Sequence, residues 1–302
     1  MPHYLIAHEG SLPYIRSVTR FLHDTLSDQL GDVTFATAAR TIDEVATAAP
    51  ATVFIIGERL DPFTRRPGHG YVYFNFSVVA RLGSPFATSL KGLKQIRGKQ
   101  KLLRAKLPLI DAVLDYYPAQ TPRLARQLPV PTAGFLPCSE PQPQPLTRTY
   151  DIAFVGGLNP RRQQVLDALT ARGISLSPTS GADLETLTAQ SRLALNVHTH
   201  RTNHLEIPRI IGALSTGTPV ITEPSYGLKH LFDTPAVIEA DLPDIPATAA
   251  ALLADPGRLA ALSAEAAAHF TAYHRRATDS LSAALAQLQR ASAPQYAQQT
   301  LA

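Results

Sequence analysis

The chain has 302 residues, of which 45% are hydrophobic and 17% are charged, a composition typical of a globular protein. This length fits about two domains of roughly 100–200 residues each. The single cysteine, Cys138, excludes an internal disulfide and a multi-cysteine zinc or iron–sulfur site. No apolar run approaches the ~18–20 residues of a membrane helix, and the N-terminus has no basic segment followed by an apolar core. We therefore expect a cytoplasmic protein without a signal peptide.

Basic residues are concentrated in one segment, although the net charge is only +4, from 28 Lys and Arg against 24 Asp and Glu. No acidic residue lies between Asp61 and Asp111, whereas ten basic residues do. Five of them recur at helical spacing beside an apolar stripe within 91–106. Such a helix is a solvated surface helix, or it contacts an anionic membrane from the cytoplasmic side, or it steers an anionic substrate. We expect no nucleic-acid partner, because the segment has no recognisable binding motif and few aromatic residues. The five are Lys91, Lys94, Arg97, Lys101 and Arg104.

Strand-like and helix-like segments alternate along the chain, which predicts an α/β protein with mostly parallel sheets. In the first half we expect strands at 4–8, 32–38, 52–57, 71–77 and 109–116, with helices at 12–30, from 41, and at 91–106. In the second half we expect strands at 151–155, 174–176, 193–197, 219–222 and 236–239, with helices at 160–172, 183–190, 208–215 and from about 247, interrupted at 255–257.

A proline-rich segment, 129–145, separates the two halves, and its later part is expected to be a linker. This predicts an N-terminal Rossmann-like domain at 1–140, a C-terminal one at 149–280, and a helical tail at 281–302. Two doubly wound domains in succession imply a cleft between them, faced by the carboxyl ends of the strands.

The first loop whose residues suit ligand binding follows the strand at 151–155. Gly156 and Gly157 allow a close backbone approach, and Arg161 and its neighbour Arg162 begin the next helix. Free amides at the start of a helix, together with arginines, favour a phosphate group. The two glycines are not a full dinucleotide fingerprint, and a tight turn with solvated arginines is the alternative.

The second loop, 197–209, is the densest polar cluster in the chain. Its three histidines predict either a metal site or a site for anions and hydroxyl groups, and we favour the second because no further acidic ligand is nearby. Pro208 fits the first turn of a helix, which leaves Glu206 before the helix and available to a ligand. We include His198, Arg201, Glu206 and Arg209 among the donor-binding candidates.

Two further groups of residues follow strands. Gly217 is expected to end a helix, and Glu223 leaves the next strand toward the same cleft; Gly217, Thr218 and Glu223 are donor-binding candidates. His8 and Glu9 follow the first strand, and we expect one of them to contact the acceptor or to act as a base.

These loops resemble the C-terminal half of a GT-B glycosyltransferase. Residues 206–223, reading EIPRIIGALSTGTPVITE, resemble the donor-binding region of group 1 glycosyltransferases, and the nearest variant is a bacterial branch that includes CgeB-like proteins. Segments 154–162 and 253–258 resemble the first loop and the C-terminal helical region of that domain. The resemblance covers roughly 149–276, with weak similarity before it at 71–75 and 115–117.

The resemblance implies transfer of a sugar from a nucleotide-diphosphate sugar to a glycan, lipid or protein acceptor. The nucleotide sugar is then a substrate, and we expect no metal or other cofactor. Many group 1 enzymes bind the nucleotide ribose with a glutamate where this chain has Gly212, and His204 stands where they have a second carboxylate. Two alternatives therefore stay open: a non-catalytic protein that binds sugar nucleotides, or a nucleotide-sugar epimerase.

Overall fold

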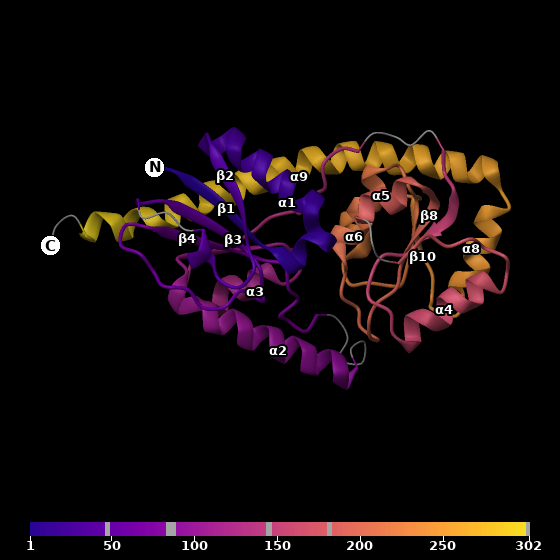
Figure 1. Ribbon diagram of the computed structural model, residues 1–302, viewed down its shortest axis with the longest axis horizontal. Helices are drawn as coiled ribbons and strands as arrows, with labels where there is room; N and C mark the ends of the chain where they lie inside the picture. The colour runs from indigo at the N-terminus through magenta and orange to yellow at the C-terminus, as the bar shows by residue number, and fades with distance from the viewer. Residues whose placement is uncertain (46–48, 83–88, 143–146, 180–182, 300–302) are drawn as a thin grey trace.

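The computed structural model describes residues 1–45, 49–82, 89–142, 147–179 and 183–299, with side chains up to residue 291 (Figure 1). It contains two parallel sheets, each flanked by helices, and the alternation of strands and helices expected from the sequence is confirmed.

The first sheet has the strand order β2-β1-β3-β4-β5-β6. Apolar residues at consecutive positions of its central strands, such as Leu5, Ile6 and Ala7, are fully buried, because helices cover both faces of the sheet. Its strands are β1 (His3–His8), β2 (Val33–Ala38), β3 (Thr52–Ile56), β4 (Gly70–Asn75), β5 (Ala112–Asp115) and β6 (Thr132–Gly134), and its helices are α1 (Leu12–Leu30), α2 (Leu90–Lys106) and α3 (Thr121–Gln127).

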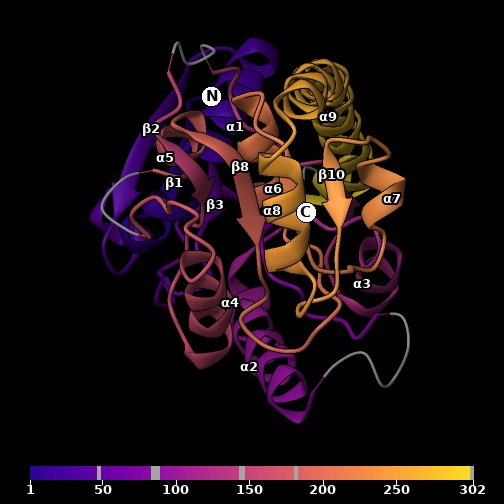
Figure 2. The same cartoon turned by 90° about the vertical axis from the view of Figure 1, so that its right-hand side faces the viewer.

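The second sheet has the strand order β10-β9-β8-β7, and Figure 2 shows that β8 and β10 point in the same direction. The residues that start and end its helices follow ordinary rules: Asn159 caps α4 by accepting from the amide of Arg162, and Pro160 occupies its first turn. Its strands are β7 (Tyr150–Ala153), β8 (Ser191–Asn196), β9 (Val220–Thr222) and β10 (Val237–Glu239), and its helices are α4 (Pro160–Thr170), α5 (Leu184–Ala189), α6 (Ile207–Ser215), α7 (Leu228–Leu231) and α8 (Ile245–Leu253).

Helix α9 (Pro256–Gln299) runs along both halves of the molecule (Figure 1). The segment expected to be a separate tail, 281–302, is up to residue 299 the continuation of this helix. Leu281, Leu285 and Leu288 are buried in the same apolar cluster as Phe54 and Ala133 of the first sheet. The second domain thus returns a helix to the first, and no helix in the described part of the chain has both the length and the apolar character needed to cross a bilayer.

Some predicted elements differ in detail from the structure. The strand expected at 174–176 is reduced to a single bridge between Ile152 and Leu176. The short strand β6 and helix α3 were not expected, since both are brief and lie in or beside the proline-rich segment.

Candidate functional site

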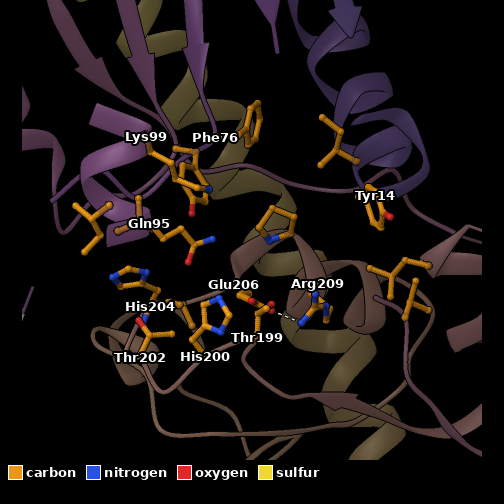
Figure 3. Close-up of a pocket in the computed structure, with 18 residues that line it drawn as sticks. Tyr14, Phe76, Gln95, Lys99, Thr199, His200, Thr202, His204, Glu206 and Arg209 are labelled. Carbon is orange, nitrogen blue, oxygen red and sulfur yellow. Dashed lines mark hydrogen bonds and ion pairs between the residues drawn. The ribbon is translucent and has the colours of Figure 1, made fainter. Parts of the chain in front are cut away.

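A pocket of about 370 Å³ lies between the two domains (Figure 3). The first domain lines it from α1, α2 and the exits of β4 and β5, and the second domain lines it mainly from the loop 199–206 and the start of α6. We call it the cleft pocket. The residues that carry its polar and aromatic groups are Tyr14, Phe76, Gln95, Lys99, Tyr116, Thr199, His200, Thr202, His204, Glu206 and Arg209. Its position at the carboxyl ends of parallel strands matches the usual place of ligands in such sheets.

Hydrogen bonds tie the loop 199–206 to the first domain and so fix one wall of the pocket. The hydroxyl of Tyr117 donates to the carbonyl of Tyr226 at 2.8 Å and accepts from the amide of Leu205 at 3.3 Å. The Asn203 amide group donates to the carbonyl of Leu82 at 2.8 Å. The pocket is therefore built by both domains together.

Arg209 is held at the floor of the pocket by two acceptors. Its Nη1 donates to Oδ1 of Asn196 at 2.7 Å and also to the carboxylate of Glu206. Asn196 is fully buried at the end of β8, and its own amide group donates to Thr222 at 2.9 Å. These hydrogen bonds fix the orientation of the Arg209 guanidinium, and its Nη2 then faces Gly156 in the loop after β7.

Gly156 is the meeting point of two guanidinium groups. Its φ of +151° is one that residues with a side chain rarely adopt, and a Cβ there would lie 3.3 Å from both Arg162 Nη1 and Arg209 Nη2. Arg162 is buried; burial and the nearby Arg209 lower its pKa to about 10. Its Nη2 makes no hydrogen bond to any described residue, and the Glu206 carboxylate is 4.0 Å away. Two converging cations, one with an unused donor, favour binding of an anion.

Arg161 and Glu223 form an ion pair beside these residues. Arg161 donates both terminal nitrogens to the Glu223 carboxylate, which also accepts from the amide of His198 at 2.7 Å. Burial alone would raise the pKa of Glu223, but these partners outweigh it and lower the pKa. His198 is buried, its pKa is lowered by burial, and its Nε2 is 3.2 Å from the hydroxyl of Ser225.

The charges of this group leave a positive surplus. Among the described residues, Arg161, Arg162 and Arg209 pair with two carboxylates, those of Glu206 and Glu223, which leaves one excess positive charge. The described residues contain no group of three or more His, Cys, Asp or Glu able to hold a metal ion.

The wall of the cleft pocket formed by the first domain faces His204. Burial, with smaller effects of His198 and Lys99, lowers the pKa of His204 to about 4, so the imidazole is neutral at pH 7. Its Nε2 is buried and makes no hydrogen bond in the described structure. Figure 3 shows His204 on the same side of the pocket as Gln95 and Lys99.

Several predicted residues are brought together here, and others are not. Glu206 and Arg209 line the cleft pocket. Gly156 lies where the guanidinium groups of Arg162 and Arg209 converge, and Gly157 accepts a hydrogen bond from Arg162 at 2.8 Å. Arg161, His198 and Glu223 form the adjoining ion-pair cluster, where Glu223 is already bonded by Arg161 rather than open to a sugar hydroxyl.

Gly217 and Thr218 lie at the opposite end of the second sheet. Helix α6 runs antiparallel to the strands, so its C-terminal turn ends far from the cleft, and Gly217 provides the left-handed residue with φ of +63°. The buried hydroxyl of Thr218 is bonded to Thr188 and Arg148. The expectation that these two residues bind a donor finds no support here, and their role is structural.

His8, Glu9 and Arg201 do not line the cleft pocket. The His8 ring is bonded to the hydroxyl of Ser11 at 3.1 Å, and Glu9 is exposed and accepts from Thr37. Arg201 is exposed, and its carbonyl accepts from the amide of Ser89 at 3.1 Å. Their catalytic or donor-binding roles stay predictions.

Sequence reasoning missed Asn196, Phe76, Tyr116 and Lys99. Asn196 was recognisable as a polar residue ending an apolar strand, as polar residues at strand ends reach the ligand edge of the sheet. Phe76 and Tyr116 look like core aromatics in the sequence, and only the meeting of two strand exits reveals their place in the pocket.

Gly212 lies on the face of α6 that packs against α5. A Cβ at this position would lie 2.7 Å from Leu184 Cδ2 and 3.1 Å from Glu185 Oε1. A side chain at this position would therefore require the ends of the Leu184 and Glu185 side chains to shift, and this chain carries no carboxylate where the resemblance leads one to expect a glutamate.

Comparisons with known proteins agree with this geometry. Residues 148–282 match the family model Glyco_trans_1_2, described as glycosyl transferase-like. No curated protein matches the sequence significantly. The structure of S. aureus TarM in complex with UDP is 11% identical with a TM-score of 0.58, and the match covers 82% of this chain and 57% of TarM.

Two other solved structures are similar over nearly their whole length. Sucrose-phosphate synthase from Thermosynechococcus elongatus is 13% identical with a TM-score of 0.57, covering 97% of this chain and 100% of that one. Anabaena HepE in complex with UDP is 12% identical with a TM-score of 0.52, covering 98% and 100%. This chain spans little more than half the length of TarM.

The fold is thus that of the GT-B glycosyltransferases, with two Rossmann-like domains facing a cleft. Gly156, Arg162, Glu206 and Arg209 all lie within residues 148–282, the part of the chain that matches the glycosyl transferase-like family model.

Proposed function

We propose that the protein transfers a sugar from a nucleotide-diphosphate sugar to an acceptor, with the donor bound in the cleft pocket. The observation that carries this proposal is the convergence of Arg162 and Arg209 on Gly156 at the exit of β7. A diphosphate provides the two negative groups that such a pair of guanidinium groups binds best. The relatives whose structures contain UDP, TarM and HepE, support a nucleotide donor.

The residues of the cluster suit the physical task of the reaction. As the bond between sugar and phosphate loosens, negative charge grows on the departing diphosphate, and preorganised cations stabilise it. Arg162 and Arg209 supply these cations, and Asn196 and Glu206 hold Arg209 in position. Gly156 lets the backbone and both guanidinium groups approach the same point, and Glu206 lies where it can also accept from a hydroxyl of the donor.

The acceptor would enter from the side of the first domain, past Gln95, Lys99 and His204. We also propose, independently of the transfer reaction, a contact of helix α2 with the inner face of a membrane, a cytoplasmic location and membership of the CgeB-like branch. The buried, unpaired Cys138 suits a reducing compartment.

A second candidate is a non-catalytic protein that binds sugar nucleotides, and the packing around Gly212 favours it. With glycine at this position, α6 lacks the carboxylate that the resemblance leads one to expect toward the ribose. The nearby carboxylate of Glu185 is half-buried, and burial raises its pKa.

Calorimetric titration with UDP, GDP and their glucose conjugates tests the proposal. We expect one of the nucleotides to bind, Arg209→Ala to weaken binding at least ten-fold, and the melting temperature of this variant to change little. Arg258→Ala, an exposed arginine of α9, is the matched control. Absence of binding by all four compounds would refute the proposal, and binding without hydrolysis or transfer of the sugar would favour the second candidate.

A further inference from the structure

Helix α2 forms one wall of the cleft pocket and turns a cationic face to solvent. Gln95, Ile96 and Lys99 line the pocket, while Gly92, Ile96 and Leu103 are buried. Lys91, Lys94, Arg97, Lys101 and Arg104 are all exposed. At 100° per residue these five fall within an arc of about 140°, opposite the buried face. With a rise of about 1.5 Å per residue, the cationic face from Lys91 to Arg104 is about 20 Å long.

Nothing in the described part of the chain neutralises this face. None of the five cations takes part in an ion pair or a side-chain hydrogen bond there. The carboxylate of Glu58 pairs at 3.5 Å with Lys99, which lies on the pocket side of α2 and not among the five. In many surface helices, carboxylates at i,i+4 positions balance the cations. Helix α2 has no acidic residue, so its cations have no such partner within the helix.

The cationic face also contains exposed apolar side chains. Leu90, at the first position of α2, is 85% exposed and lies on the same arc as the cations, and Leu102 is 41% exposed beside it. Aromatic residues, which stack on sugars or bases, do not occur in this helix. Cations mixed with apolar groups fit the surface of an anionic bilayer, where headgroups pair with lysines and the acyl boundary accepts leucine.

We propose that α2 docks the protein on an anionic membrane, with the mouth of the cleft pocket beside the lipid surface. The N-terminal end of α2 is tied to the pocket loop by the hydrogen bond from Ser89 N to Arg201 O at 3.1 Å, so docking of the helix positions the pocket as well. That the acceptor is then carried by the membrane rests on the proposed transfer reaction. The docking itself does not, and its test needs no donor or acceptor.

The test is co-sedimentation of the full chain with lipid vesicles. We expect binding to phosphatidylcholine vesicles that contain about 30% phosphatidylglycerol, little binding to pure phosphatidylcholine, and weakening as NaCl is raised from about 0.1 M to 0.5 M. The variant Lys94→Gln/Arg97→Gln/Lys101→Gln/Arg104→Gln should bind at least about 20-fold more weakly, since each cation near an anionic surface strengthens binding roughly five-fold. Leu90→Gln should weaken binding severalfold.

A matched control removes four charges from other faces of the molecule. The variant Arg123→Gln/Arg126→Gln/Arg258→Gln/Arg275→Gln has the same net charge, and all four residues are exposed on α3 and α9. Its affinity for anionic vesicles should lie within about two-fold of that of wild type, because salt screens the attraction between the vesicle and charges far from its surface. UDP titration of all variants reports separately on the proposed function.

Three outcomes would overturn the inference. They are no binding of wild type to the anionic vesicles, equal losses in the α2 variant and the control, and binding of inorganic polyphosphate through α2 without binding of vesicles. The last would assign the face to a soluble polyanion. A protein that binds UDP but not vesicles would retain the proposed function and lose only the membrane contact.

Discussion

Arg161 and Glu223, which are 62 positions apart in the chain, form a bidentate ion pair at the edge of the site. Arg161 lies in the first turn of α4, after β7, and Glu223 follows β9, so the pair joins the exits of the two strands that flank β8 in the second sheet. The amide of His198, at a third exit, donates to the same carboxylate. One carboxylate thus organises three loops around the candidate phosphate site.

Replacement of this carboxylate should destabilise the protein. We expect Glu223→Gln to lower the free energy of unfolding by about 1–3 kcal/mol at pH 7, because Arg161 loses a charge-assisted bond in a mostly buried place. Urea denaturation measures the change. Glu239→Gln, on an exposed position of β10, should change it by less than about 0.5 kcal/mol.

The same pair predicts an acid dependence. Folding lowers the pKa of Glu223 from its ordinary value near 4.5. The ionised carboxylate therefore contributes to the free energy of unfolding above that value, and the contribution is lost as the pH falls below it. The difference in stability between wild type and Glu223→Gln should therefore shrink between pH 5 and about pH 3. A difference that stays constant across this range would contradict the assignment.

Gly156→Ala should impair both stability and nucleotide binding. A methyl group would meet Arg162 and Arg209 at 3.3 Å on a backbone with φ of +151°. We expect the free energy of unfolding to fall by about 1–3 kcal/mol and UDP affinity to fall at least about ten-fold. Gly70→Ala, where no atom lies within 4 Å of the new Cβ, is the control. If Gly156→Ala binds UDP like wild type, the two guanidinium groups do not meet the nucleotide.

Gly212→Glu tests whether the packing of α6 against α5 excludes a side chain. Its Cβ would lie 2.7 Å from Leu184, and we expect a loss of at least about 2 kcal/mol in stability from overpacking. Gly98→Glu, on the exposed face of α2 with nothing within 4 Å, should be neutral or stabilising, because glycine is a poor helix former. A stable Gly212→Glu variant with higher UDP affinity would show that the site does accept the glutamate.

His204 predicts a loss of stability at mildly acidic pH. Its pKa is about 4 in the folded protein and about 6.5 when unfolded, so the unfolded chain binds the proton first as the pH falls. We expect the free energy of unfolding to decrease by roughly 2 kcal/mol between pH 7 and pH 5 through this residue. His204→Gln should remove this part of the slope, whereas His230→Gln, an exposed histidine, should retain it. Parallel slopes in wild type and His204→Gln would count against the buried neutral imidazole.

The sequence predicted much of this architecture from local features. Helix α1 begins and ends at the predicted residues, 12 and 30, and Pro208 correctly marks the first turn of α6 and leaves Glu206 before it. Alternating strands and helices also predict that loops after strands share one edge, which is how Glu206 and Arg209 were found.

Other features depend on contacts between distant segments, which no local pattern contains. The pairing of Arg161 with Glu223 uses up two charges that seemed available to a ligand. Thr218 looked like part of a glycine loop at the site, but the direction of α6 places it at the far edge. An alanine-rich helix such as α9 has no strong apolar stripe, so the sequence alone does not indicate that it packs on the first domain as well as the second.

Because α9 returns to the first sheet, the N-terminal domain is discontinuous in sequence. A fragment ending near residue 140 would leave bare the apolar surface that Leu281, Leu285 and Leu288 cover, and we expect it to aggregate. Helix α9 connects the two domains a second time, in addition to the proline-rich segment near residue 140. A rotation of one domain relative to the other must therefore bend this helix or move it along the first domain. Helix α9, on the opposite side of the molecule, therefore limits how far the cleft can open.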